Sequence, residues 1–167
     1  ANATPVYVGY MAGGRHTDGG RLTNYHCLND IPQYIDSTTA DENGGLLWIV
    51  EYRTAGYGVN SLDGISGQKA RCSVCEVAAH SQQIVIPGTA TCPGGWTEAY
   101  DGFLFGSYYS GHANSESVCI DRNAQGYTAG SPDGGEYSLI YPIEFQSYDG
   151  ASPYTHDREL SCVVCTK

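Results

Sequence analysis

The chain has little positive charge, a single methionine and no long apolar run. Its 167 residues hold eight lysines and arginines against 18 aspartates and glutamates, which gives a net charge of −10 at pH 7. This charge repels nucleic acids and anionic membranes, so we expect neither as a partner. No apolar stretch approaches the ~20 residues that span a bilayer, so we expect no membrane insertion.

The periodicity of amphipathic helices is also missing. No segment keeps apolar residues at positions i, i+3, i+4 and i+7 over three turns. The apolar runs are instead short, rich in β-branched and aromatic residues, and separated by clusters of Gly, Asp, Asn and Pro. These runs are 46–52, 75–79, 83–87, 102–109 and 137–145. We therefore predict an all-β fold of many short strands.

Motifs of metal binding and catalysis do not occur. The five histidines are scattered and form no metal-binding pair, and a nucleophile elbow, a phosphate loop and an EF-hand loop are lacking. The acidic segments 41–45 and 133–136 lack the alternating oxygen ligands of a calcium loop, so we interpret them as turns. We expect no metal, no other cofactor and no catalysis.

A repeated cysteine pattern is the most informative feature that is present. Cys27 recurs 92 residues later as Cys119, and the pair Cys72 and Cys75 recurs 90 residues later. The two Cys-x-x-Cys pairs are too far apart for a zinc ribbon, and a redox pair would need a βαβ context. We interpret the cysteines as disulfide staples of a protein from an oxidising compartment. The seven candidates are Cys27, Cys72, Cys75, Cys92, Cys119, Cys162 and Cys165.

The segments between the cysteines repeat as well. Residues 7–13 match 100–106, and residues 48–52 match 141–145, in each case 93 residues later. We predict tandem duplicated β units over 1–79 and 80–167, packed as one compact unit.

The disulfide connectivity stays open at this point. Cys92 has no counterpart in the first unit, whose opening strand is truncated. Pairing within each unit would give two disulfides to the second unit and one to the first. The cysteine left over from Cys72 and Cys75 would then be free, buried or bonded between chains.

Glu51 and Glu144 occupy matching places in otherwise apolar strands. Paired carboxylates can hydrolyse glycosides, but a duplication creates two related sites and not two catalysts around one bond. We favour partly buried carboxylates held by backbone donors or by an arginine such as Arg71 or Arg158.

Three segments carry a resemblance to a known family: 91–102, 118–121 and 158–165. They resemble the C-terminal non-collagenous domain of short-chain, spongin-type collagens, which is similar to the duplicated, trimer-forming C-terminal domain of basement-membrane collagen. The resemblance implies a β-rich tandem repeat that self-associates as a homotrimer. The chain departs from this family in having no collagenous tract. As a stand-alone, acidic copy of the domain, it also resembles a marine sponge lectin that binds N-acetylhexosamines. We expect Ala1 to be a mature N-terminus of a secreted protein, with a glycosylation sequon at 2–4.

Fourteen tyrosines provide the chemistry for binding a sugar. A tyrosine offers a flat apolar face to the C–H surface of a sugar and a polar tip to its hydroxyls. The segments 14–25 and 106–116 crowd aromatic and polar residues in matching places of the two units, and 156–159 forms a third polar cluster. The candidate contacts are Tyr108, Tyr109, His112, Asn114 and Glu116, with Arg15, His16, Asp18 and Asn24 in the first unit.

These features favour a secreted lectin for N-acetylglucosamine and N-acetylgalactosamine, multivalent through oligomerisation. The alternative is a structural trimerisation domain of the extracellular matrix, which needs the same scaffold without a sugar site.

Overall fold

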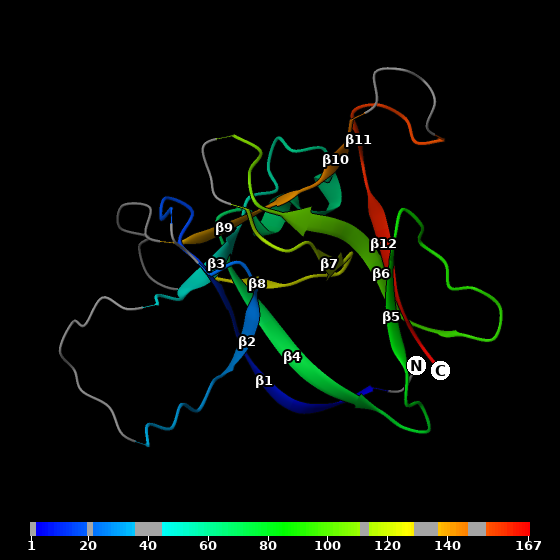
Figure 1. Cartoon of the computed structure of the whole chain (residues 1–167), viewed down its shortest axis with the longest axis horizontal. Helices are drawn as coiled ribbons and strands as arrows, with labels where there is room; N and C mark the ends of the chain where they lie inside the picture. Colours follow the sequence, from blue (N-terminus) through cyan, green and yellow to red (C-terminus); the bar gives the residue numbers. More distant parts are fainter. Residues whose placement is uncertain (1–2, 20–21, 36–44, 111–113, 129–136, 147–152) are drawn as a thin grey trace.

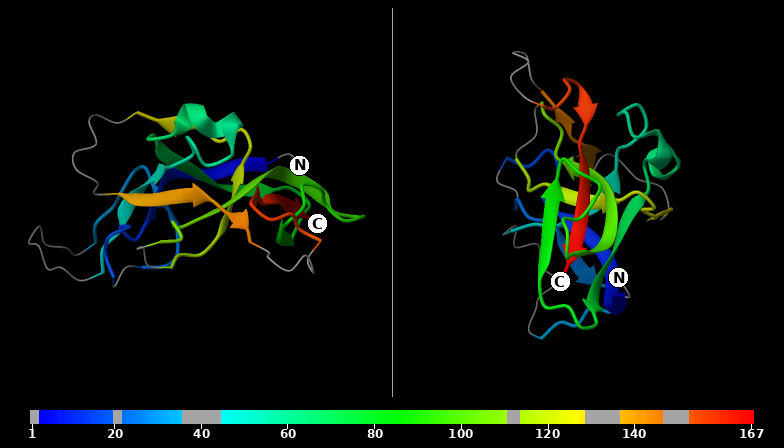
Figure 2. Two further views of the ribbon diagram at one scale, coloured as in Figure 1. Left: turned by 90° about the horizontal axis from the view of Figure 1, so that it is seen from above. Right: turned by 90° about the vertical axis from the view of Figure 1, so that its right-hand side faces the viewer.

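The protein is almost entirely β, as predicted. The computed structural model describes residues 3–19, 22–35, 45–110, 114–128, 137–146 and 153–167 (Figures 1 and 2). A 3₁₀ helix, η1, spans Asn60–Ile65. The strands are β1 (Ala3–Gly13), β2 (His26–Asn29), β3 (Trp48–Tyr52), β4 (Lys69–Val77), β5 (Gln83–Pro87), β6 (Thr97–Gly106), β7 (Val118–Asp121), β8 (Gly126–Tyr127), β9 (Ser138–Pro142), β10 (Glu144–Phe145), β11 (Arg158–Glu159) and β12 (Ser161–Thr166).

Ten of these strands form one sheet. Its path runs β2-β1-β4-β3-β9-β6-β12-β5, with β7 beside β6 and β8 beside β4, while β10 and β11 form a separate ribbon. The pairing of β3 with β9 is parallel and joins the two halves of the chain. The other pairings within the described residues are antiparallel.

The two halves repeat the same strand registers. Gly9 of β1 lies opposite Asn29 and Cys72, just as Gly102 of β6 lies opposite Asp121 and Cys162. A bulge interrupts β1 against β4 near Pro5 and β6 against β12 near Val164, again at matching places.

The side chains around these glycines match as well. The Tyr7 hydroxyl donates to the Cys27 carbonyl, and the Tyr100 hydroxyl donates to the Cys119 carbonyl, each over 3.0 Å. A Cβ atom at either glycine would collide with a carbonyl oxygen of the neighbouring strand. The same local geometry therefore needs a glycine in both halves.

Three disulfides cross-link the strands and loops of the sheet. Cys27 bonds Cys72 and Cys119 bonds Cys162, at matching positions and with Cα atoms 5.7 Å apart in both. The third bond joins Cys92 to Cys165. The pairing therefore stays within each half, and Cys75 is the cysteine left over, exposed at the surface.

The larger hydrophobic core draws on both halves. Val50 on β3, Phe105 on β6 and Ile140 on β9 are completely buried in it. A second cluster belongs to the second half alone and surrounds the Cys119–Cys162 bond. Because the first core contains residues from both halves, neither half buries its apolar face alone.

Candidate functional site

Four tyrosines gather where β6 and β9 meet, and we call them the tyrosine cluster: Tyr57, Tyr108, Tyr109 and Tyr141. The Tyr108 ring lies 4.9 Å from Tyr109 and 5.0 Å from Tyr141, measured between ring centroids. Tyr57 lies 5.0 Å from Tyr141, edge to face. Tyr109 is 90% exposed, so the cluster presents an open aromatic ring to solvent.

Local backbone geometry explains how the cluster forms. The end of β6 pairs Gly106 with Tyr141 of β9, which brings the next residues of the chain beside that ring. Tyr57 comes from a tight turn after β3, in which Gly56 and Gly58 have φ angles of 81° and 78°. These angles are costly for residues with a Cβ atom, so the two glycines allow the turn that presents Tyr57.

Two phenols of the cluster, those of Tyr108 and Tyr141, have pKa values raised above the ordinary value of tyrosine. The electrostatic effect of the neighbouring Tyr109 phenol is the main cause that raises the pKa of Tyr108, and partial desolvation raises it further. Burial is the main cause that raises the pKa of Tyr141, and the nearby Tyr57 phenol raises it further. The Arg53 guanidinium acts in the opposite direction and lowers this pKa. Each hydroxyl can therefore both donate and accept a hydrogen bond to a neutral ligand.

A buried ion network lies next to the cluster. The Glu51 carboxylate is only 2% exposed and accepts hydrogen bonds from Lys69 Nζ at 2.6 Å and Arg53 Nη2 at 2.8 Å. An arginine does bind this carboxylate, but it is Arg53 and not the predicted Arg71, and the register of β3 against β4 adds Lys69 opposite Glu51. Arg71 instead pairs with Asp30 at 3.6 Å.

Arg53 connects this network to the cluster. Its backbone N–H donates to the Ile140 carbonyl over 2.9 Å, next to Tyr141, and its side chain is 41% exposed. Arg53 was not among the residues predicted to bind ligand, because its place beside Tyr141 depends on the pairing of β3 with β9.

The first half carries a related arrangement. Arg15 and Trp48 lie 93 residues before Tyr108 and Tyr141. The Arg15 guanidinium carbon stands 5.1 Å from the centre of the Trp48 ring, a cation–π contact in place of the contact between two tilted phenols. Trp48 Nε1 is buried without a hydrogen-bond partner among the described residues. His16 follows, with Nδ1 2.8 Å from the Tyr137 carbonyl oxygen.

The two predicted loops meet each other. Glu116 donates its backbone N–H to the Thr23 carbonyl, and its carboxylate accepts from the Tyr25 N–H at 2.5 Å. The Tyr25 hydroxyl donates to Ser115 Oγ at 3.2 Å. Glu116 therefore holds the loops together, and its role as a ligand contact stays a prediction.

The other residues predicted to bind a sugar do not form a single cluster around the contact between the two loops. Asn114 and Asn24 are exposed, and Asn24 Oδ1 accepts a hydrogen bond from Thr23. Asp18 donates its N–H to the Arg15 carbonyl in a turn. His112 lies outside the described residues. Of the predicted residues, the structure brings Tyr108 and Tyr109 together in one aromatic surface.

Sequence analysis missed Tyr57, Tyr141 and Trp48 as site residues. The repeat itself carried a signal for two of them, because Trp48 aligns with Tyr141, 93 residues later. Tyr57 follows from the turn geometry and has no comparable signal in the sequence.

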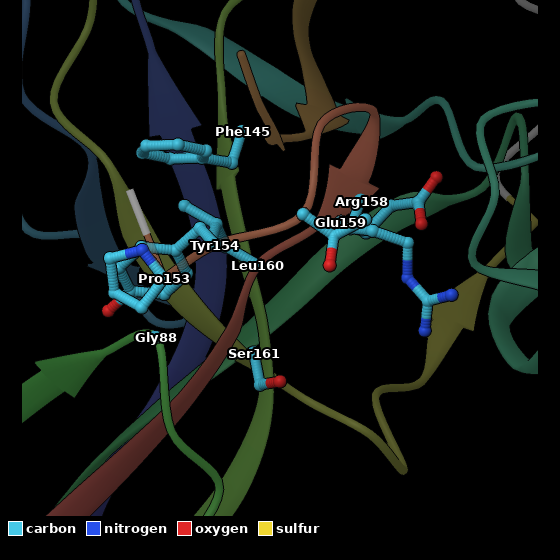
Figure 3. A pocket seen from close by; sticks show the side chains of 9 residues that line it. Gly88, Phe145, Pro153, Tyr154, Arg158, Glu159, Leu160 and Ser161 are labelled. Carbon is cyan, nitrogen blue, oxygen red and sulfur yellow. The ribbon is translucent and has the colours of Figure 1, made fainter. Parts of the chain in front are cut away.

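A cavity of about 340 Å³ lies beside β11, near the predicted polar cluster 156–159. Figure 3 shows the rings of Phe145 and Tyr154 on one side of it, with Arg158 and Glu159 on the other. The two rings are 4.9 Å apart and tilted by 36°. His156 and Asp157 do not line it, and Asp157 accepts a hydrogen bond from Gln146 at 2.8 Å.

Within the described part of the chain, no group of three or more His, Cys, Asp or Glu side chains could hold a metal ion. The helical content there includes no segment with the length and apolar character needed to cross a bilayer. The three disulfides fit an extracellular protein. No family model, no curated protein and no solved structure matches the chain.

Proposed function

We propose that this protein is a secreted lectin that binds N-acetylhexosamines through the tyrosine cluster. The observation that carries the proposal is the exposed Tyr109 ring, which packs on Tyr108 at an interplanar angle of 55°, with Tyr141 in contact with Tyr108. Tyr109 is exposed and continuous with the partly exposed rings of Tyr108, Tyr141 and Tyr57, and a contiguous aromatic patch of this kind suits a ligand contact. The acidic chain favours a neutral ligand over a nucleic acid or an anionic lipid.

The chemistry of an N-acetylated sugar suits this surface. The apolar C–H face of the pyranose ring packs on Tyr109, and the acetamido methyl group packs beside it. The phenols of Tyr108 and Tyr141 donate to and accept from the sugar hydroxyls. The exposed part of the Arg53 side chain donates to the acetamido carbonyl, which distinguishes these sugars from glucose.

Repetition would strengthen weak single sites. The Arg15–Trp48 pair offers a second, different contact in the first half, and self-association as the homotrimer that the collagen-like resemblance implies would multiply both. A glycan bound at several sites gains avidity without any new contact.

Calorimetric titration of the purified protein tests the proposal, with N-acetylglucosamine, N-acetylgalactosamine and glucose as ligands and with or without a chelator. We expect saturable binding of the two acetamido sugars, unaffected by the chelator, and none of glucose. Tyr109→Ala should weaken binding at least about tenfold, which corresponds to 1.4 kcal/mol. Tyr34→Ala is the matched control, because Tyr34 is also highly exposed, at 78%, and should leave the affinity unchanged.

A folded protein that binds none of these sugars would refute the lectin proposal. The alternative function is a structural matrix domain, favoured by the exposed apolar side chains of Ile31 and Ile35. Sedimentation analysis that shows a trimer without any sugar binding would support that alternative.

A further inference from the structure

We propose that a second copy of this chain pairs with the open edge of β4, and that a disulfide between the two Cys75 residues locks the contact. This interface is independent of the proposed sugar binding. A comparison of the two halves suggests it. In the second half both edges of the last strand are paired with other strands, whereas in the described part of the first half one edge of the corresponding strand, β4, is largely unpaired.

The second half shows how the position is filled. Its last strand, β12, pairs with β6 on one edge and with β5 on the other, over five residue pairs from Cys162 to Thr166. Cys165 on this strand is bonded to Cys92, which follows β5 in the chain. The strand is therefore covered on both edges, and its cysteines are buried.

Among the described residues of the first half, no strand covers the corresponding edge over residues 71–77. β4 corresponds to β12, and its residues 71–77 pair with β1 on one edge. On the other edge, the pairing within the described residues is that of β8 with Lys69 and Ala70. Cys75 corresponds to Cys165, yet it is exposed and bonded to no other cysteine.

The surroundings of Cys75 leave room for a partner. Residues 73–76 are all exposed, and Val74 shows 39% of its surface to solvent. A cavity of about 500 Å³ lies alongside and is lined by Cys75, Val77, His80 and Gln83, among others. Unpaired strand edges with exposed apolar side chains readily accept another strand.

A second copy fits this edge because the edge is self-complementary. Antiparallel pairing about a two-fold axis at Cys75 places Ser73 opposite Val77 and Val74 opposite Glu76 of the other copy, so no like charges face each other. The partner strand then ends opposite Arg71, because the chain turns at Ala79, where φ is 63°. It stops just short of Ala70, which β8 already occupies.

The same pairing suits a disulfide. Directly opposite residues of antiparallel strands have Cα atoms about 4.5–5.5 Å apart and side chains on the same face of the sheet. Disulfides need Cα separations of roughly 4.4–6.8 Å, so two facing Cys75 residues can bond without moving the backbone.

The bond forms by thiol–disulfide exchange with a low-molecular-weight disulfide of the oxidising compartment. The Cys75 thiolate attacks this disulfide, breaks its S–S bond and releases one thiol. The Cys75 thiolate of the second copy then attacks the mixed disulfide and releases the other thiol. In total, two protein thiols are oxidised and one small disulfide is reduced to two thiols.

Electrophoresis and peptide mapping test the covalent bond. Protein prepared without reductant and quenched with N-ethylmaleimide should run as a dimer that reductant converts to a monomer. Its digest should contain two Cys75 peptides joined by a disulfide. Cys75→Ser should abolish the covalent dimer and keep the three other disulfides. A monomer with one alkylated thiol per chain would overturn the proposal, as would Cys75 bonded to a small thiol or to a different protein.

Two further variants test the strand pairing. Val74→Glu places a carboxylate opposite Glu76 of the partner and should lower the yield of dimer several-fold. Val8→Glu is the matched control on β1, with 40% exposure, and should leave the yield unchanged. Amide hydrogen exchange of residues 73–77 should be slower in the dimer than in Cys75→Ser. Equal exchange rates, or equal yields for the two glutamate variants, would show that the edges do not pair.

Discussion

Glu51 and Lys69 form a buried ion pair in the first half, with 2.6 Å between Oε2 and Nζ. The residues at matching positions in the second half are Glu144 and Glu159, which lie opposite each other in the β10–β11 ribbon. One exchange of lysine for glutamate therefore turns an attractive cross-strand pair into a repulsive one. The burial follows the same difference: Glu51 is buried within the sheet, whereas Glu144 is exposed on a separate ribbon.

Neutralising Glu51 should destabilise the fold. Glu51→Gln leaves the buried Lys69 ammonium without its countercharge, so we expect the free energy of unfolding to fall by about 3 kcal/mol. Urea denaturation followed by fluorescence measures this loss. Glu144→Gln is the matched control and should change the stability by less than about 0.5 kcal/mol. Equal effects of the two variants would contradict the role assigned to the ion pair.

Sugar binding should depend more on the second half than on the first. Tyr141 packs against the Tyr108 ring, whereas Trp48 at the matching position packs against Arg15. Tyr141→Ala should weaken the affinity for N-acetylglucosamine about tenfold, or 1.4 kcal/mol. Trp48→Ala should weaken it about twofold. Titration of both variants, with their folding checked by circular dichroism, decides between them, and a larger loss in Trp48→Ala would move the main site to the first half.

Alkaline pH should destabilise the protein through Tyr52. Burial raises the pKa of this phenol from 10.0 to about 12. Below pH 10 the phenol is protonated in both the folded and the unfolded chain, so its contribution to stability is fully present. Between pH 10 and 12 the unfolded chain loses the proton first, and about 3 kcal/mol of stability is lost.

The Tyr52→Phe variant isolates this effect. Phenylalanine keeps the buried ring and removes the ionisable hydroxyl, so its stability should fall less between pH 9 and pH 11.5 than that of the wild type. Rapid-mixing denaturation curves across this range provide the measurement. Parallel losses in both proteins would mean that other groups dominate the alkaline transition.

Much of the fold follows from local sequence signals. The short apolar runs and the turn residues between them predicted the all-β class, and the repeated cysteines marked the positions of two matching disulfides. The contacts of Tyr57 and Arg53 could not be predicted in the same way, because they depend on tertiary neighbours. A turn between two glycines presents Tyr57, and the pairing of strands from different halves places Arg53 beside Tyr141.

The partner of Glu51 shows the same limit. We predicted backbone donors or an arginine such as Arg71 or Arg158, and an arginine, Arg53, does bind Glu51, but the residue types alone do not supply the register of β3 against β4. The residue opposite Glu51 is decided by that register, and it is a lysine. Predicting a buried ion pair therefore requires the strand alignment as well as the residue types.

The parallel pairing of β3 with β9 has a consequence for how the chain folds. Val50 lies opposite Ser138, so these neighbours in the sheet are 88 residues apart in the chain. Contacts between such distant residues raise the contact order, and the entropy of closing a long loop slows the folding step that forms them. On the ribosome, β3 has to wait until β9 has been synthesised and has left the exit tunnel. During that time the first half depends on β1, β2, β4 and the Cys27–Cys72 bond to hold its shape.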